Sequence, residues 1–389
     1  MKVERDFSVP LIAVACTLAA IYTALFLCVL PFDREIMARR DYIVYWATGQ
    51  QLIHHGNPYD PAALNRIERN AGFQGGKSYY MRNTPWALPL ALPLGFFAAQ
   101  TAALPWCLLM LGLLVVSVRM LWKVLGPPPR SRLDWLGYCF PPALYCVDLG
   151  QTSILLLFGL VLFLRLHNSR PFAAGAALWL CALKPHLFLP FVLVLLMWIV
   201  VSRSYRILAG ALLALGAGAA ATACVDPAAW TQYAYYMRTS GITREFTATI
   251  GAALRDSINP FAEWLAFLPC ILGCIWAAAY FLARRSTWNW IDHGNPLILV
   301  SLLVAPFGWI FDHSLAIPAV LFAASRTSSR VLLSILALIF MGIEVEVIHF
   351  DLHSAAYLWI APAWLIWYLI ARASATQQRS TIATTELMT

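Results

Sequence analysis

The chain of 389 residues is 61% hydrophobic and only 12% charged, and its mean hydropathy is +0.69. Soluble domains average about 25% charged residues, so this composition excludes a water-soluble globular protein and predicts an all-α polytopic membrane protein. The net charge of +8 lies mainly in short basic connectors between apolar segments, which indicates membrane topology rather than nucleic-acid binding.

Apolar segments that reach or approach the length needed to cross ~30 Å of hydrocarbon recur along the whole chain. Residues 1–8 form a basic leader, but the apolar run that follows is too long for a signal peptide and lacks a small-residue cleavage site, so we expect an anchored first helix. The segment 85–98 contains Pro85, Pro89 and Pro93, and is either a short crossing or a segment lying against the bundle. The predicted spans are 9–31, 100–122, 134–148, 151–167, 171–184, 186–202, 206–225, 261–283, 296–311, 313–326, 330–349 and 353–371.

Basic residues gather in alternate connectors, and placing all of them in the cytoplasm puts both termini inside after twelve crossings. Residues 1–372 then form one membrane domain, with a polar cytoplasmic tail at 373–389 and with the loops 32–84 and 226–260 outside. The polar turns 148–151, 184–186 and 311–313 fall on the same outer face, which favours a functional site there. The basic residues used are Lys2, Arg5, Arg119, Lys123, Arg130, Arg132, Arg165, Arg170, Arg203, Arg206, Arg284, Arg285, Arg326, Arg330, Arg372 and Arg379.

The sequence offers no soluble nucleotide-binding unit and no obvious metal site. It has no Asp-x-Asp motif in a soluble domain and no Gly-rich phosphate loop. The nine cysteines lie in or beside apolar stretches without metal-ligand spacing. His54 and His55 are adjacent, so on a helix they point about 100° apart and are poorly placed to share an ion. We therefore expect neither a divalent metal nor another cofactor.

A series of motifs follows one another between residues 40 and 320. They are the loop segment 41–59, the Pro85-rich entry to the next apolar segment, Gly150-Gln151-Thr152-Ser153, Ala174-Gly175-Ala176 leading to Leu183-Lys184-Pro185, and Ala305-Pro306-Phe307-Gly308-Trp309 followed by Asp312-His313. In this order the pattern resembles glycosyltransferase family 87, a group of GT-C-fold membrane enzymes that includes mycobacterial polyprenol-phosphate-mannose-dependent mannosyltransferases.

The resemblance implies a multi-pass enzyme of the cytoplasmic membrane that works at its extracytoplasmic face. Its substrates would be a polyprenyl-phosphate hexose, with mannose the expected sugar, and a hydroxyl on a lipid or glycan acceptor of the cell envelope. Its partners would be membrane lipids and not nucleic acid. Enzymes of this type are thought to invert the anomeric centre, and direct displacement needs one general base on the acceptor hydroxyl.

Asp41 is the candidate base. It follows the first long apolar segment, where partial burial near hydrocarbon would raise the pKa of its carboxyl toward a useful range. The structural alternative is an ion pair with Arg39 or Arg40. Asp33 and Glu35 are second choices for the base, because we expect both to be solvated.

Six further residues are candidates for binding the donor phosphate or sugar, and each has a structural alternative. His313 could donate to the phosphate with Asp312 fixing its tautomer, or it could cap helix carbonyls. Lys184 stands in an apolar run and needs an anion as partner. This anion is either a polyprenyl phosphate, which His186 would also contact, or the structural alternative Asp148. Gln151 could bind a sugar hydroxyl or cap a helix. Arg82, which follows Tyr79 and Tyr80, could clamp a phosphate or anchor the interface.

Two other classes of function stay open. The first is a transporter or flippase of lipid-linked saccharides, although no repeat between the halves is visible. The second is a polysaccharide polymerase or ligase, although the large loop is early and contains the acidic candidates. Glu344 and Glu346 lie in an apolar run, where they either face a polar cavity or pair with His349 and nearby arginines.

Overall fold

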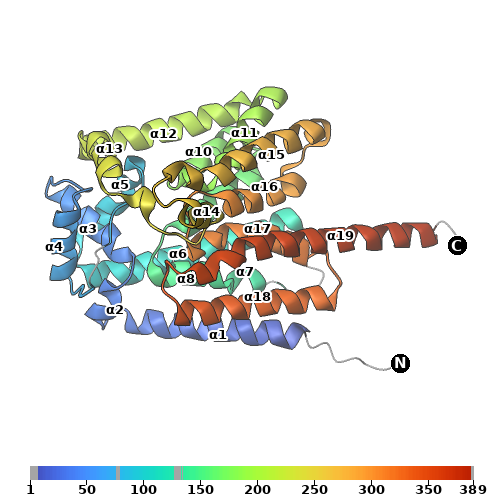
Figure 1. Ribbon diagram of the computed structural model, residues 1–389, viewed down its shortest axis with the longest axis horizontal. Helices are drawn as coiled ribbons and strands as arrows, with labels where there is room; N and C mark the ends of the chain where they lie inside the picture. Colours follow the sequence, from blue (N-terminus) through green and yellow to red (C-terminus); the bar gives the residue numbers. More distant parts are fainter. Residues whose placement is uncertain (1–7, 76–78, 127–132, 134, 387–389) are drawn as a thin grey trace.

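The computed structural model describes residues 8–386 except 76–78, 127–132 and 134, and in this part of the chain all regular structure is helical (Figure 1). The α-helices are α1 (Ser8–Val29), α2 (Arg34–Ala38), α3 (Tyr42–Ile53), α4 (Pro61–Asn70), α5 (Leu88–Ala91), α6 (Ala99–Leu125), α7 (Trp135–Tyr138), α8 (Pro141–Leu149), α9 (Ser153–Leu166), α10 (Pro171–Cys181), α11 (Leu189–Ser202), α12 (Tyr205–Val225), α13 (Ala229–Thr239), α14 (Ile250–Ile258), α15 (Leu268–Arg284), α16 (Trp290–Val304), α17 (Ile317–Ala324), α18 (Arg330–His349) and α19 (Ile360–Glu386). The short 3₁₀ turns are η1 (Pro85–Ala87), η2 (Leu92–Phe96), η3 (Pro185–Leu187), η4 (Ile242–Arg244), η5 (Glu263–Ala266), η6 (Arg285–Thr287), η7 (Ile310–Ala316) and η8 (Ala355–Trp359).

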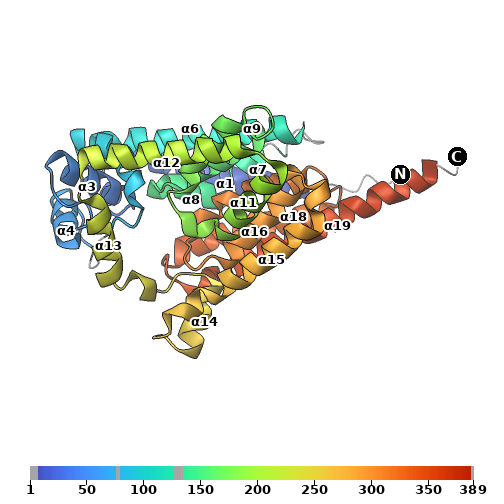
Figure 2. The same ribbon diagram turned by 90° about the horizontal axis from the view of Figure 1, so that it is seen from above.

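The long helices lie lengthwise beside one another in one bundle (Figures 1 and 2). Within the described residues, five helical segments are long and apolar enough to cross a membrane, namely 99–125, 205–225, 263–287, 330–349 and 355–376. Seven shorter apolar helices accompany them. The chain is therefore a multi-pass membrane protein, and the all-α polytopic class predicted from composition is confirmed.

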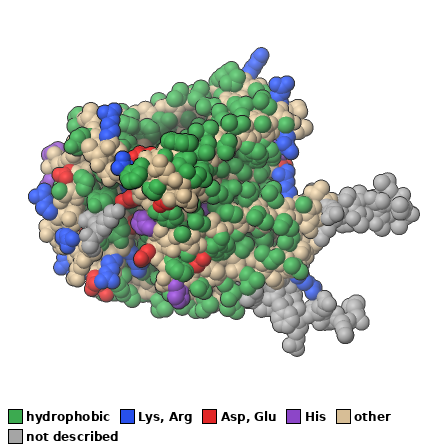
Figure 3. All heavy atoms as spheres, viewed as in Figure 1, with side chains coloured by type: hydrophobic (Ala, Val, Ile, Leu, Met, Phe, Trp, Pro, Cys, Tyr) green, Lys and Arg blue, Asp and Glu red, His purple; other side chains and the backbone are tan. Residues whose placement is uncertain are grey.

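The two ends of the bundle differ in chemistry. Hydrophobic side chains cover the middle of the visible surface, while lysines and arginines form a row at the end where α1 begins and α19 ends (Figures 1 and 3). We call this end the basic end. Acidic and histidine side chains gather toward the opposite end, together with further lysines and arginines, around α2, α3, α4 and α13 (Figures 1 and 3), and we call it the polar end. Lys2, Arg5, Arg130 and Arg132, which the topology prediction used, lie outside the described residues.

Prolines and glycines move several predicted helix boundaries. The predicted span 296–311 is interrupted, because α16 ends at Val304 and a non-helical segment with Pro306 and Gly308 precedes η7, which contains the predicted polar turn 311–313. The span predicted at 134–148 is two pieces, α7 and α8, because Pro141 and Pro142 start a new helix. The polar tail expected from residue 373 continues α19 as a helix to Glu386.

The proline-rich segment 85–98 lies against the bundle at the polar end. It forms η1, α5 and η2, which pack on α3 and α12. Gly49 of α3 and Gly95 of η2 touch backbone to backbone: a Cβ at Gly95 would lie 2.3 Å from the Gly49 carbonyl oxygen. Gln50 Nε2 and Trp46 Nε1 donate to the carbonyls of Gly95 and Phe97 at 2.7 and 2.9 Å. This contact fixes α3, and with it Asp41 at the helix start.

Candidate functional site

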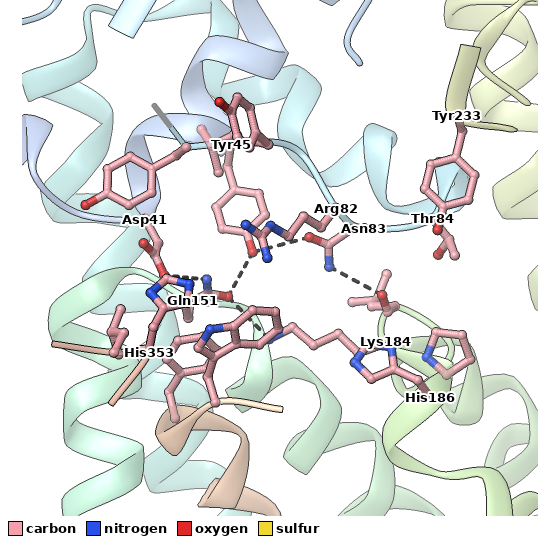
Figure 4. Close-up of a pocket in the computed structure, with 18 residues that line it drawn as sticks. Asp41, Tyr45, Arg82, Asn83, Thr84, Gln151, Lys184, His186, Tyr233 and His353 are labelled. Atoms are coloured by element: carbon pink, nitrogen blue, oxygen red, sulfur yellow. Dashed lines mark hydrogen bonds between the residues drawn. The ribbon is translucent and has the colours of Figure 1, made fainter. Parts of the chain in front are cut away.

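A pocket of about 350 Å³ lies where five connecting segments meet α3 and α13 (Figure 4). Its volume is at the lower end of the range of ligand pockets. Five of the seven predicted site residues line it, although they come from four segments far apart in sequence. The residues that line the pocket are Asp41, Val44, Tyr45, Tyr79, Tyr80, Arg82, Asn83, Thr84, Gln151, Leu183, Lys184, Pro185, His186, Tyr233, Trp309, Phe311, Leu352 and His353.

Asp41 presents a buried carboxyl to this pocket. Asp41 occupies the N-cap position of α3, but its side chain makes no capping hydrogen bond. The residue is only 7% exposed. Its carboxylate accepts a 2.6 Å hydrogen bond from Gln151 Nε2. Burial raises the pKa of Asp41 above its ordinary value, against the opposing effects of Gln151, Lys184 and Arg82. A carboxyl with a raised pKa is suited to accept a proton near neutral pH.

Asp41 does not pair with Arg39, which forms an ion pair with Glu35 instead. Arg40 places its guanidinium over the ring of Phe26, 4.7 Å from the ring centre. The other two acidic candidates also have structural partners. Asp33 caps α2 by accepting from the amides of Glu35 and Ile36, and Glu35 pairs with Arg39. The alternative of an ion pair with Arg39 was therefore wrong, whereas Arg40 forms no ion pair with Asp41 in the described part of the chain but still helps to lower the pKa of its carboxyl.

Gln151 reaches Asp41 because the backbone turns sharply just before it. Gly150 ends α8 at φ +67°, in the left-handed region where glycine is unstrained, and a Cβ there would lie 2.6 Å from Cβ of Tyr42. The Gln151 amide then spans the pocket: its Oε1 accepts from Tyr45 Oη at 3.0 Å and from Lys184 Nζ at 3.4 Å. Gln151 makes no helix cap in this arrangement.

Lys184 finds its anion in Asp312, and the predicted partner Asp148 was wrong. The Lys184 Nζ to Asp312 Oδ1 distance is 2.7 Å, and both side chains are buried. Asp312 also accepts from Ser153 Oγ at 2.6 Å and from the Trp309 amide at 2.9 Å, so its carboxylate is fully engaged. Lys184 Nζ lies 4.5 Å from the centre of the Phe311 ring. The ammonium group therefore forms part of the pocket wall with a carboxylate behind it.

Arg82 and His186 supply further hydrogen-bond donors to the lining of the pocket, and His186 lies next to Lys184 (Figure 4). Arg82 Nη2 bonds Glu245 of the second loop at 2.6 Å, and its guanidinium lies 5.3 Å from the centre of the Trp309 ring. Arg82 Nη1 and His186 Nε2 are buried and have no partner among the described residues. Burial lowers the pKa of His186 to about 4, so its imidazole is neutral and offers one N–H at pH 7.

His313 is not part of this pocket, contrary to the sequence prediction. It lines a separate small cavity with Thr249 and Ile250, and its Nδ1 has no partner among the described residues. Asp312 does not set its tautomer, because the hydrogen bonds of Asp312 go to Lys184, Ser153 and the Trp309 amide. Asp312 and His313 both line this small cavity, and Asp312 reaches the main pocket only through its ion pair with Lys184.

Several pocket residues escaped the sequence prediction. Tyr233 and His353 belong to segments with no motif, and only the fold brings them to the pocket. The same holds for Glu245, which does not line the pocket but pairs with Arg82. Trp309 and Phe311 lie within a motif that was noticed, and their rings stack at 6.1 Å with a 10° interplanar angle. The two aromatic residues at alternate positions just before Asp312 were the sequence feature that could have indicated them as pocket residues.

Glu68 and the pair Glu344 and Glu346 lie outside the pocket. Glu68 is buried in α4 and accepts from the Tyr79 amide at 3.2 Å, and burial raises its pKa to about 8. Glu346 accepts from Trp359 Nε1 at 2.7 Å. The predicted pairing with His349 was wrong, because His349 Nδ1 bonds the Val345 carbonyl of its own helix. No group of three or more metal-ligating side chains occurs in the described residues.

A model of glycosyltransferase family 87 matches residues 80–334, about two thirds of the chain. The chain belongs to glycosyltransferase family 87. It is therefore a membrane glycosyltransferase, which sets aside the transporter and polymerase classes considered from the sequence. No curated protein and no solved structure matches the chain significantly. The family 87 match includes Arg82, Gln151, Lys184 and Asp312, whereas Asp41 precedes it, so the case for Asp41 rests on its place in the pocket.

Proposed function

We propose that this family 87 protein transfers a hexose, with mannose as the first candidate, from a polyprenyl-phosphate donor to a hydroxyl of a lipid or glycan acceptor. The observation that carries the proposal is one pocket in which a buried carboxyl of raised pKa faces the donor groups of Lys184, Arg82 and His186. A sugar phosphate needs this combination, because one end of the reaction gains a proton while the other develops negative charge.

The proposed step is a single inverting displacement. Asp41 accepts the proton of the acceptor hydroxyl while the acceptor oxygen forms a bond to the anomeric carbon. The bond from that carbon to the phosphate oxygen breaks with its electron pair, and polyprenyl phosphate leaves. No further reactant is needed, since the lipid-linked sugar carries its own leaving group.

Before any substrate binds, Arg82 is paired with Glu245 and Lys184 with Asp312. The donor phosphate must therefore bind beside these ion pairs. We propose that the phosphate takes the free donors first, Arg82 Nη1 and His186 Nε2, and that Lys184 adds positive charge while it stays on Asp312. A fully unpaired cation would bind any anion, whereas these donors favour a group that fits between them.

The setting fits a lipid-borne donor at the outer face of the cytoplasmic membrane. The site belongs to the polar end of the bundle, next to the hydrophobic band that lipid tails would cover (Figure 3). The arginine-rich opposite end agrees with a cytoplasmic location by the positive-inside tendency.

The test compares wild type with Asp41→Asn in membranes supplied with radiolabelled polyprenyl-phosphate mannose and a native lipid extract. We expect transfer to fall about 10²- to 10⁴-fold, the contribution of a general base. Asp33→Asn is the matched control, because an asparagine also caps a helix, and it should keep activity within about twofold. Unchanged transfer by Asp41→Asn in a folded protein would remove Asp41 from the mechanism. No transfer by wild type would show that the proposed donor is wrong.

A further inference from the structure

A second, larger cavity of about 600 Å³ opens on the side of the bundle, away from the catalytic pocket. Its floor is α16, with Pro296, Val300 and Val304, and its walls are one face of α15 and one face of α19. The remaining lining residues are Pro269, Leu272, Gly273, Trp276, Tyr280, Arg284, Leu365, Leu369 and Arg372. We call this cavity the side groove.

The side groove is an apolar channel that faces the surrounding lipid. Leu272 and Leu369 on its opposite walls are 58% and 49% exposed, and Trp276 is 38% exposed. The helices α15 and α19 each contact α16, so the groove runs lengthwise between them through the hydrophobic band (Figures 1 and 3). Its shape and chemistry suit a hydrocarbon chain.

The charge of the groove is confined to one end. Arg284, in the last turn of α15, and Arg372 of α19 are its charged lining residues, and both belong to the basic end of the bundle. The guanidinium of Arg284 lies 4.3 Å from the centre of the Tyr280 ring and forms no ion pair among the described residues. Its five N–H donors therefore remain available to an anion.

Arg372 is partly committed to the fold. Pro296 lacks an N–H, so within α16 it leaves the Asp292 carbonyl without its usual partner four residues on. Arg372 Nη1 donates to that carbonyl at 3.3 Å. Arg372 therefore holds α19 against α16, and its guanidinium also interacts with the side chains of Tyr280 and Tyr368. Arg284 is the freer of the two cations at the groove end.

We propose that the side groove binds an anionic phospholipid of the leaflet next to the basic end. Its acyl chain lies along Leu272, Val300 and Leu369, and its phosphate is held by Arg284 and Arg372. The site is separate from the catalytic pocket, and its occupation joins α15 to α19. The proposal does not depend on the donor or acceptor of the glycosyl transfer.

The test uses the full-length protein in nanodiscs that contain equal amounts of phosphatidylglycerol and phosphatidylcholine, followed by native mass spectrometry of the retained lipids. Wild type should retain phosphatidylglycerol in preference. Arg284→Gln should lower that preference roughly fivefold, the effect of removing about 1 kcal/mol of attraction per arginine. Arg284→Lys should keep part of it.

Arg285→Gln is the matched control, because Arg285 is exposed, adjacent and absent from the lining. It should retain the wild-type preference. Val300→Phe, which fills the floor without changing charge, should reduce bound phosphatidylglycerol while Arg284 is intact. Equal retention of the two lipids by wild type would overturn the proposal. A loss of phosphatidylglycerol preference in Arg285→Gln as large as in Arg284→Gln would also overturn it. So would the detection of a lipid-free dimer in place of a lipid-bound monomer.

Discussion

Gln151 joins the two charged halves of the pocket through a single amide. Its Nε2 donates to Asp41, which helps the ionised carboxylate, and its Oε1 accepts from Tyr45 and Lys184. The orientation of this amide follows from its neighbours, since a carboxylate accepts and an ammonium group donates. In the proposed mechanism Gln151 would position Asp41, and its hydrogen bond lowers the pKa of that carboxyl.

Replacing Gln151 with Leu should change how activity depends on pH. Burial raises the pKa of Asp41 and the Gln151 hydrogen bond lowers it, so loss of the bond leaves the pKa higher. A base works only when ionised, and activity therefore falls as pH drops through its pKa. We expect the acidic limb of kcat/KM to move to higher pH, measured by transfer assays across a pH series. A uniform loss at every pH would indicate a purely structural role.

Lys184 and Asp312 should be strongly coupled in stability. Removing one member of a buried ion pair costs about 3–5 kcal/mol, because the other charge stays buried. We expect Lys184→Met to lower the thermal unfolding temperature markedly in detergent. Adding Asp312→Asn should recover part of the loss, because asparagine keeps an acceptor for the Trp309 amide without the charge.

An assay of sugar transfer distinguishes a role of Lys184 in donor binding from its role in stability. The double variant should remain inactive if the Lys184 ammonium group stabilises the donor phosphate. Losses that simply add, with no recovery in the double variant, would contradict the coupling.

Residue types were readable from the sequence, but their partners were not. A lysine in an apolar run had to meet an anion, yet Asp148 is 36 positions away and Asp312 is 128, and both were available in the sequence. Only the fold decides between them. His313 shows the same gap at short range, because the sequence placed it in a polar turn beside Asp312 but did not show that this turn is a 3₁₀ helix or which cavity His313 lines.

At the scale of elements, α3 is the piece on which the site depends. Asp41 and Tyr45 lie at the start of α3, and one turn further along the helix the backbone of Gly49 packs against that of Gly95. The sequence showed the prolines around this contact but left two alternatives, since a proline-broken apolar segment suits both a short crossing and a segment lying on the bundle. The packing of two glycines, 46 positions apart, shows only that the segment lies against α3.

Gly95→Ala should therefore destabilise the protein and reduce transfer together. The new methyl group would meet the Gly49 carbonyl at 2.3 Å, so the backbones must separate, and overpacking of this kind costs about 1–3 kcal/mol. Gly112→Ala in α6 is the control, since nothing lies within 4 Å of its Cβ position. Alanine is the better helix former by about 1 kcal/mol, and this variant should unfold at the wild-type temperature or above. Equal unfolding temperatures for the two variants would show that the α3 contact is unimportant.

At the scale of the whole molecule, the grouping of polar turns was the most informative sequence prediction. Counting basic connectors placed the turns before α9, before α11 and at η7 on one face, and all three contribute to one pocket with Asp41, the third through Phe311. This succeeded because a helical bundle has only two ends, so the alternation of spans decides which turns meet. The helix ends themselves were less predictable, because prolines and glycines inside apolar stretches shift them.

The orientation of the bundle in the membrane follows from the same asymmetry and can be measured directly. The basic end should face the cytoplasm and the polar end the outside. In a background without the exposed Cys28 and Cys224, Ala62→Cys on α4 and Ser286→Cys on η6 place one thiol at each end. A membrane-impermeant maleimide applied to intact cells or spheroplasts should label the first, and should label the second only after permeabilisation. The reverse pattern would put the pocket in the cytoplasm and contradict an extracytoplasmic transfer, while labelling of both thiols in sealed cells would contradict the bundle as a barrier with two separate ends.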